Sequence, residues 1–94
     1  MSKLDEARVK IDGIDSKIIE LFEERMSTVI DVINYKIENN IPVLDSSRES
    51  AMLDKNLKKI KNKDYKKYYQ SVLEGFLKAS KDMQKDILDN YSKK

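Results

Sequence analysis

An apolar stripe that recurs every three or four residues over the first third of the chain is the feature that most constrains its fold. This spacing keeps the apolar side chains on one face of an α-helix, whereas a strand would show alternation. The sequence therefore predicts one long helix over about residues 3–38. The first stripe consists of Leu4, Ala7, Ile11, Ile14, Ile18 and Leu21, and a second, beside it, of Phe22, Met26, Val29, Ile33 and Ile37.

Asn39, Asn40 and Pro42 are expected to end this helix. Proline has no amide hydrogen, and it disfavours helical geometry in the residue before it. After the resulting loop, Ser46 and Glu49 have the spacing of a capping box, which predicts the start of a second helix over about residues 46–60. The neighbouring residues Asp45 and Ser47 are also suitable N-caps.

A lysine-rich connection is expected over residues 58–64, and a third helix over about residues 64–91. The sequence thus predicts an all-α fold with three helices per chain, one long, one short and one of medium length. We see no internal repeat and no second domain, so residues 1–94 are expected to form a single domain. The apolar positions of the third helix are Tyr65, Tyr69, Val72, Phe76, Met83 and Ile87.

The length of the first helix predicts a dimer. About 36 residues of helix extend for about 54 Å, whereas a compact domain of this size is about 30 Å across. The remaining residues are too few to cover two apolar stripes along that length. An intertwined two-fold homodimer, in which the long helices pack against each other, is the simplest closed solution.

The composition excludes several kinds of catalysis. The chain has no Cys and no His, so it offers no thiolate nucleophile, no Cys-based zinc site and no Ser-His-Asp triad. Carboxylates, Lys or Arg must carry any chemistry, and we expect neither a metal nor a cofactor. The net charge of +2 comes from nearly balanced signs, which does not favour nucleic acid as a partner.

The sequence shows neither a membrane span nor a secretory signal. No run of about 18 apolar residues is present, so no membrane association is expected. The first ten residues are too highly charged for a secretory signal. The expected location is therefore the cytoplasm.

Charged residues interrupt the apolar face of the first helix. Arg25 takes the place after Leu21 where an apolar residue was due, and Arg25, Val29, Val32 and Lys36 share one face. The two cations could form interhelical salt bridges or extend past the valines to water. Alternatively, they could bind a small anionic ligand above an apolar floor.

Two further polar clusters occur on the later helices. Asp45, Arg48, Glu49 and Met52 share a face at the start of the second helix, where acidic residues also favour helix formation. In the third helix, the polar residues Ser80 and Gln84 interrupt a stripe of leucines. A buried Gln must find hydrogen-bond partners, either on another helix or on a ligand. Together the three clusters could build a site between facing helices.

At these positions the sequence resembles the all-helical chorismate mutases, and the resemblance extends from Leu4 to Leu88. The family pattern of Arg, a few residues and then Ile-x-x-Leu/Ile-Asp opens the chain, and Leu-x-x-Glu-Arg with a Lys eleven residues later follows. A Pro-Val-x-Asp-x-x-Arg-Glu segment comes after the loop. The matching residues are 8–15 (RVKIDGID), 21–25 (LFEER) with Lys36, 42–49 (PVLDSSRE), and Ser80 with Gln84.

The resemblance implies a one-step rearrangement of chorismate to prephenate, within phenylalanine and tyrosine biosynthesis by the shikimate pathway. This pericyclic reaction needs no nucleophile and no proton transfer. The resemblance also implies the role of each site residue. Lys36 and Gln84 would donate to the ether oxygen, Arg25 and Arg8 would bind the two carboxylates with help from Ser80, and Glu49, with Asp45 and the backbone near Arg48, would orient the ring hydroxyl.

Helix geometry adds a condition to these roles. Arg8 and Lys36 are about 28 residues apart, or about 42 Å of helix, too far to touch the same substrate molecule. If both serve one pocket, Arg8 must come from the partner chain. One position departs from the family: Lys81 stands where relatives often have an apolar residue, so the pocket rim is expected to differ. The expected apolar lining is Val29, Val32, Met52 and Leu77.

Three other functions remain open at this point. A purely structural helical dimer would explain the stripes but not the polar residues within them. The same fold also supports an isochorismate pyruvate-lyase. A nucleic-acid binder could use the lysines and tyrosines around the start of the third helix, although a solvated connection is the simpler explanation. Its candidate residues are Lys58, Lys59, Lys61, Lys63, Lys66, Lys67, Tyr65, Tyr68 and Tyr69.

Overall fold

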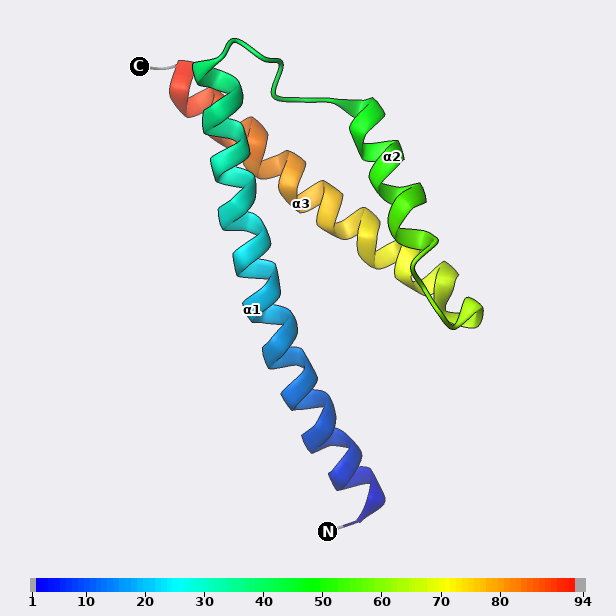
Figure 1. Ribbon diagram of the computed structural model, residues 1–94. Helices are drawn as coiled ribbons and strands as arrows, with labels where there is room; N and C mark the ends of the chain where they lie inside the picture. The colour runs from blue at the N-terminus through cyan, green and yellow to red at the C-terminus, as the bar shows by residue number, and fades with distance from the viewer. Residues whose placement is uncertain (1, 93–94) are drawn as a thin grey trace. The chain divides into compact units, whose positions relative to one another are not determined.

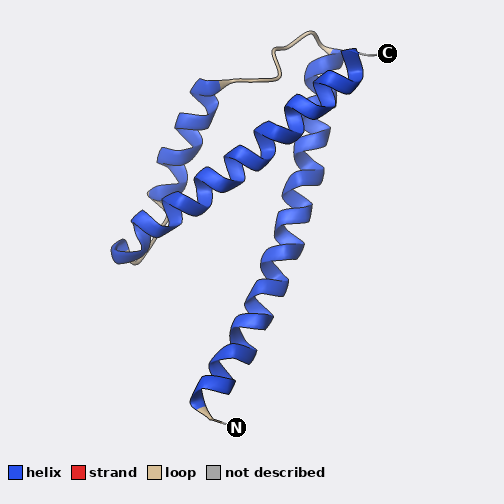
Figure 2. Ribbon diagram, turned by 180° about the vertical axis from the view of Figure 1, so that it is seen from behind, coloured by secondary structure: helices blue, strands red, loops and turns tan. Residues whose placement is uncertain are grey.

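The computed structural model describes residues 2–92, and its regular elements over that range are all helical (Figures 1 and 2). In chain order they are α1 (Lys3–Glu38), α2 (Ser46–Leu57), a 3₁₀ turn η1 (Lys63–Tyr65) and α3 (Lys66–Ser92). The all-α prediction with three helices is confirmed. None of these helices combines the length and apolar character that a membrane crossing requires.

The chain divides into two compact units, and the boundary falls within α1. The first unit ends at Val32 and the second begins at Ile33. The first unit thus consists of most of α1, and many of its large apolar side chains are exposed. Leu21 is 65% exposed, Ile11 53%, and Ile14 and Ile18 47% each.

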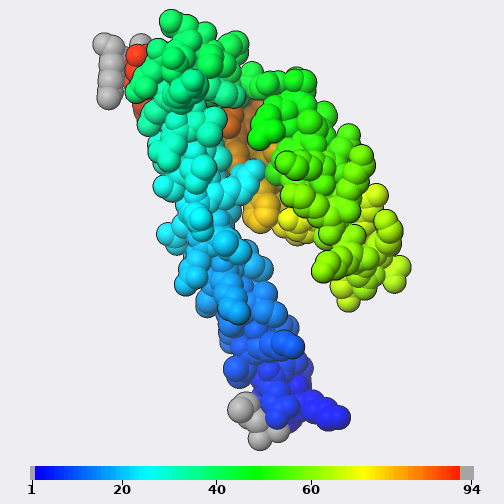
Figure 3. Space-filling view, viewed as in Figure 1, coloured from blue at the N-terminus to red at the C-terminus, as the bar shows by residue number. Residues whose placement is uncertain are grey.

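The second unit holds the last turns of α1, the loop after it, α2, η1 and α3. Helices α2 and α3 run antiparallel and contact each other, as both ribbon views show (Figures 1 and 2). In the space-filling view, the green atoms of α2 lie against the yellow and orange atoms of α3 (Figure 3). The most deeply buried apolar side chains are Ile33, which is 0% exposed, and Leu73, which is 2% exposed.

A Schellman-type turn ends α1 at the predicted place. Asn40 adopts a φ of 57°, in the left-handed region where Asn replaces the more usual Gly. Its amide donates to the carbonyl of Ile37 at 3.3 Å, and the amide of Ile41 donates to the carbonyl of Lys36 at 2.8 Å. These two bonds satisfy carbonyls that the helix end would otherwise leave free.

The predicted capping box at the start of α2 is wrong. Asp45 is the N-cap, with extended backbone angles, and its side chain accepts from the amide of Arg48 at 3.2 Å. Because Asp45 already fills this role, Ser46 is the first residue of the helix. The Glu49 side chain is instead directed toward another helix, as described below.

The later boundaries also differ from those predicted. Helix α2 ends at Leu57 rather than near Ile60, because the amides of Lys59 and Ile60 donate to carbonyls three residues back, as in a 3₁₀ turn. The α-helical part of α3 begins at Lys66 and not at 64. The intervening turn η1 is capped by Asn62, whose side chain accepts from the amide of Asp64 at 3.0 Å.

Candidate functional site

Both the backbone carbonyl and the side-chain ammonium of Lys36 form hydrogen bonds with the loop that follows α1. Its carbonyl accepts the Ile41 amide of the terminal turn, and its Nζ donates to the carbonyl of Val43 at 3.3 Å. Val43 is 8% exposed, so the loop carbonyl is anchored by a buried side chain. A lysine ammonium has three N–H donors. The half-buried Lys36 therefore keeps donors to offer beyond the one directed at Val43.

Asp45 is the charged N-cap of α2. The pKa of its carboxyl lies below the ordinary value, chiefly because the Ser47 hydroxyl donates to Oδ1 at 2.7 Å and then because the Arg48 amide donates to the same oxygen. The positive charge of Lys36 lowers this pKa further. Of the effects that lower this pKa, the attraction to Lys36 is the smallest, so it relates these two predicted site residues only weakly.

Glu49 links α2 to α3. Its Oε1 lies 3.8 Å from Nζ of Lys81, and the two side chains are 30% and 42% exposed respectively. Ser80, the neighbour of Lys81 in α3, is buried at 6% exposure, and Gln84 is half-buried. The second unit thus places one acidic residue of α2 beside the helix that carries both predicted neutral donors.

The remaining predicted residues are distributed over both units. Arg8 is exposed and Arg25 is half-buried in the first unit, whereas Arg48 is exposed in the second. The candidates for the apolar lining, taken in chain order, are half-buried except for the exposed Val32: Val29, Val32, Met52 and Leu77.

From the sequence, Lys81 was predicted only to make the pocket rim differ from that of relatives. Its contact with Glu49 was missed, because the two residues lie on different helices and no local spacing relates them. The one available signal was the unusual cation itself, which stands beside Ser80 where an apolar residue was expected. Over residues 2–92, no group of three or more acidic side chains is arranged to hold a metal ion.

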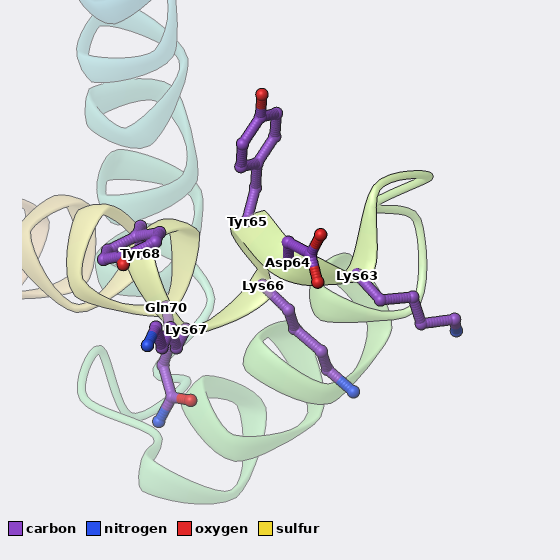
Figure 4. A pocket seen from close by; sticks show the side chains of 7 residues that line it. All are labelled: Lys63, Asp64, Tyr65, Lys66, Lys67, Tyr68 and Gln70. Atoms are coloured by element: carbon purple, nitrogen blue, oxygen red, sulfur yellow. The ribbon is translucent and has the colours of Figure 1, made fainter.

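A surface hollow near the start of α3 contains none of the site residues that the family resemblance implies (Figure 4). Within it, Nζ of Lys67 lies 5.0 Å from the centre of the Tyr68 ring, at cation–π distance. The side chains of Lys63, Tyr65 and Lys66 extend in different directions in Figure 4 and do not converge on one point. The hollow is lined by Lys63, Asp64, Tyr65, Lys66, Lys67, Tyr68 and Gln70.

The fold and these residues define a small all-helical protein with cations, carboxylates and neutral donors at helix ends and on helix faces. The family model of chorismate mutase type II matches residues 7–85. The chain therefore belongs to the chorismate mutase type II family, as its resemblance predicted.

Individual relatives agree with this assignment. A chorismate mutase of Methanocaldococcus jannaschii is 44% identical over 55 residues, which cover 58% of this chain and 56% of that protein. A bifunctional chorismate mutase/prephenate dehydratase of Buchnera aphidicola subsp. Schizaphis graminum is 33% identical over 86 residues, 89% of this chain and 22% of that protein. The chain thus matches about half of the first relative and about a fifth of the second. No solved structure matches it significantly.

Proposed function

We propose that this chain is a chorismate mutase that converts chorismate to prephenate, with residues 1–94 acting as one catalytic domain. The observation that carries the proposal is the family match over residues 7–85, since that range includes every proposed site residue from Arg8 to Gln84. The names of the relatives agree with a role in aromatic amino acid biosynthesis. We place the enzyme in the cytoplasm.

The rearrangement breaks a carbon–oxygen bond and forms a carbon–carbon bond in one step. The protein must therefore hold the flexible enolpyruvyl chain over the ring, which lowers the entropic part of the barrier. It must also stabilise the negative charge that develops on the ether oxygen as its bond to the ring lengthens. Neither task requires the nucleophiles and bases that this chain lacks.

Lys36 and Gln84 are the proposed donors to the ether oxygen. The hydrogen bond from Lys36 to Val43 restrains the ammonium near the end of α1, so its remaining N–H groups are preorganised. Gln84, half-buried on α3, adds a neutral donor. Donors fixed before the reaction stabilise the transition state without a reorganisation cost.

The two carboxylates of chorismate are assigned to two arginines. Arg25 and the partner subunit's Arg8 would each bind one, because a planar guanidinium can form two parallel bonds to a carboxylate. The buried Ser80 hydroxyl would assist. Glu49 would accept the ring hydroxyl, with Asp45 and the backbone near Arg48 completing that side of the site.

A homodimer is part of this proposal. The apolar side chains of the first unit are largely exposed in the single chain, and a second copy would bury them against its own matching stripe. The helical separation of Arg8 from Lys36 supports the exchange of Arg8 between subunits. We propose that the dimer is required for activity.

The decisive experiment follows the loss of chorismate absorbance with purified protein and identifies the product. Formation of prephenate is expected. Failure to consume chorismate, or a preference for releasing pyruvate from isochorismate, would contradict the proposed function.

A further inference from the structure

The ion pair between Glu49 and Lys81 joins the two helices of the second unit. Their 3.8 Å separation is too long for a direct hydrogen bond but short enough for electrostatic attraction between opposite charges. Both side chains are more than half covered, so water screens the attraction less than it screens a pair at the surface. The pair therefore restrains where the Glu49 carboxylate lies relative to α3.

A second ion pair on α3 provides a contrast. Lys78 and Asp82 lie 2.8 Å apart on the same helix, with side chains 78% and 55% exposed. Such a pair joins two residues one turn apart on a single helix, so it does not link α3 to α2. Lys81 differs from Lys78 because it reaches across to the helix that carries a proposed site residue.

The register of α3 also places Lys81 beside the proposed site. Leu77, Lys81 and Gln84 are separated by four and three residues, so they lie along one side of the helix. Ser80 directly precedes Lys81 and is buried. The cation that contacts Glu49 thus comes from the same stretch of α3 as the two proposed neutral donors.

We propose that Lys81 is a positioning residue for Glu49, an inference that rests on the proposed chorismate mutase activity. An ionised carboxylate has two oxygens, each with acceptor capacity. Attraction to Lys81 restrains Oε1 and leaves Oε2 to accept the ring hydroxyl of chorismate. Lys81 itself contacts no part of the substrate.

This role has a distinct kinetic consequence. The ring hydroxyl takes no part in the bonds that break and form, so its contact with Glu49 has nearly the same strength in the ground state and the transition state. An interaction of that kind changes KM and leaves kcat unchanged. Loss of Lys81 should therefore weaken substrate binding without lowering the rate at which the bound substrate rearranges.

The test compares the K81M and K78M variants, which remove the same charge from the same helix. K81M is expected to raise KM about two- to fivefold with kcat within about twofold of wild type, and K81R to bring KM most of the way back to the wild-type value. K78M is expected to match wild type. Equal KM values for K81M and K78M would overturn the inference, as would a fall in kcat alone.

A double-variant cycle tests whether Lys81 acts through Glu49. The KM of E49Q/K81M is expected to equal that of E49Q alone, because a residue that only positions Glu49 has nothing left to position. Additive losses would overturn the inference and assign Lys81 a contact of its own. An inactive wild-type protein would refute the underlying function, whereas normal wild-type kinetics with an unaffected K81M would refute only the role of Lys81.

Discussion

Lys36 donates from its Nζ to the carbonyl of Val43 at 3.3 Å while its own carbonyl accepts the amide of Ile41 at 2.8 Å. One residue thus fastens both its backbone and its side chain to the loop between α1 and α2. The position of the ammonium depends on that loop and on the buried Val43 side chain. A group held in this way is suited to electrostatic catalysis, which depends on donors fixed in advance.

Lys36→Ala is expected to lower kcat about 100-fold or more, because it removes a charged donor to the developing negative charge. Helix content by circular dichroism should stay close to that of wild type, since the Schellman-type turn uses backbone groups. Lys78→Ala, which removes an exposed lysine of α3, serves as the control and should leave turnover unchanged. A Lys36→Ala enzyme with normal kcat would refute the proposed ether contact.

Gln84→Met is expected to lower kcat about 10- to 100-fold while it preserves the volume of the side chain. The loss is smaller than for Lys36 because the amide is a neutral donor. The measurement is steady-state turnover of chorismate, accompanied by a thermal melt to verify folding. Retention of full activity would contradict the proposed role of Gln84 as a donor to the ether oxygen.

Mixing Arg8→Ala chains with Arg25→Ala chains should recover activity that neither variant has alone. In a heterodimer, one site combines an intact Arg25 with the partner subunit's intact Arg8, and the other site lacks both. Random exchange at equal concentrations should therefore restore about a quarter of the wild-type activity. Absence of recovery, once mass spectrometry has verified heterodimers, would contradict a shared site.

Ile33→Ala is expected to lower the free energy of unfolding by about 2–4 kcal/mol, because this side chain is 0% exposed. Urea denaturation followed by circular dichroism measures the change. Val72→Ala offers an aliphatic control on α3, where the side chain is 46% exposed, and it should have a much smaller effect. Equal losses for the two variants would contradict the placement of Ile33 in the core.

The charged cap of α2 should make stability depend on pH. The pKa of Asp45 is lowered from its ordinary 3.8, mainly by the Ser47 hydroxyl and then by the Arg48 amide, so the folded state favours the ionised form. This contribution is complete above the ordinary pKa and is lost as the pH falls through the lowered value. The melting temperature of wild type should therefore be higher than that of Asp45→Asn at pH 6. This difference in melting temperature should narrow below about pH 4.

Thermal melts of both proteins between pH 3 and pH 7 measure this difference. Asn can still accept from the Arg48 amide, so the comparison isolates the charge of the cap. A difference in melting temperature that is the same at every pH would contradict the role of Asp45 as a charged cap of α2.

Local sequence determined most of the secondary structure. The three-four spacing of apolar residues defined α1 over its full length, and Asn40 with Pro42 ended it where expected, because both signals act on nearby backbone. Where two local signals competed, the prediction failed. Asp45 and Ser46 were both suitable caps for α2, and in the structure Asp45 is the cap, with an extended backbone at φ −143°.

The sequence by itself also determined the family, because the order and spacing of Arg8, Arg25, Lys36, Glu49 and Gln84 survive in the linear chain. Only the tertiary structure joined Glu49 to Lys81 and the Lys36 ammonium to the carbonyl of Val43. The physical reason is the distance along the chain between the residues that interact. Helix periodicity and caps depend on residues three or four apart, whereas the Glu49–Lys81 attraction depends on how α2 packs against α3, and the Lys36 bond on how the intervening loop folds back.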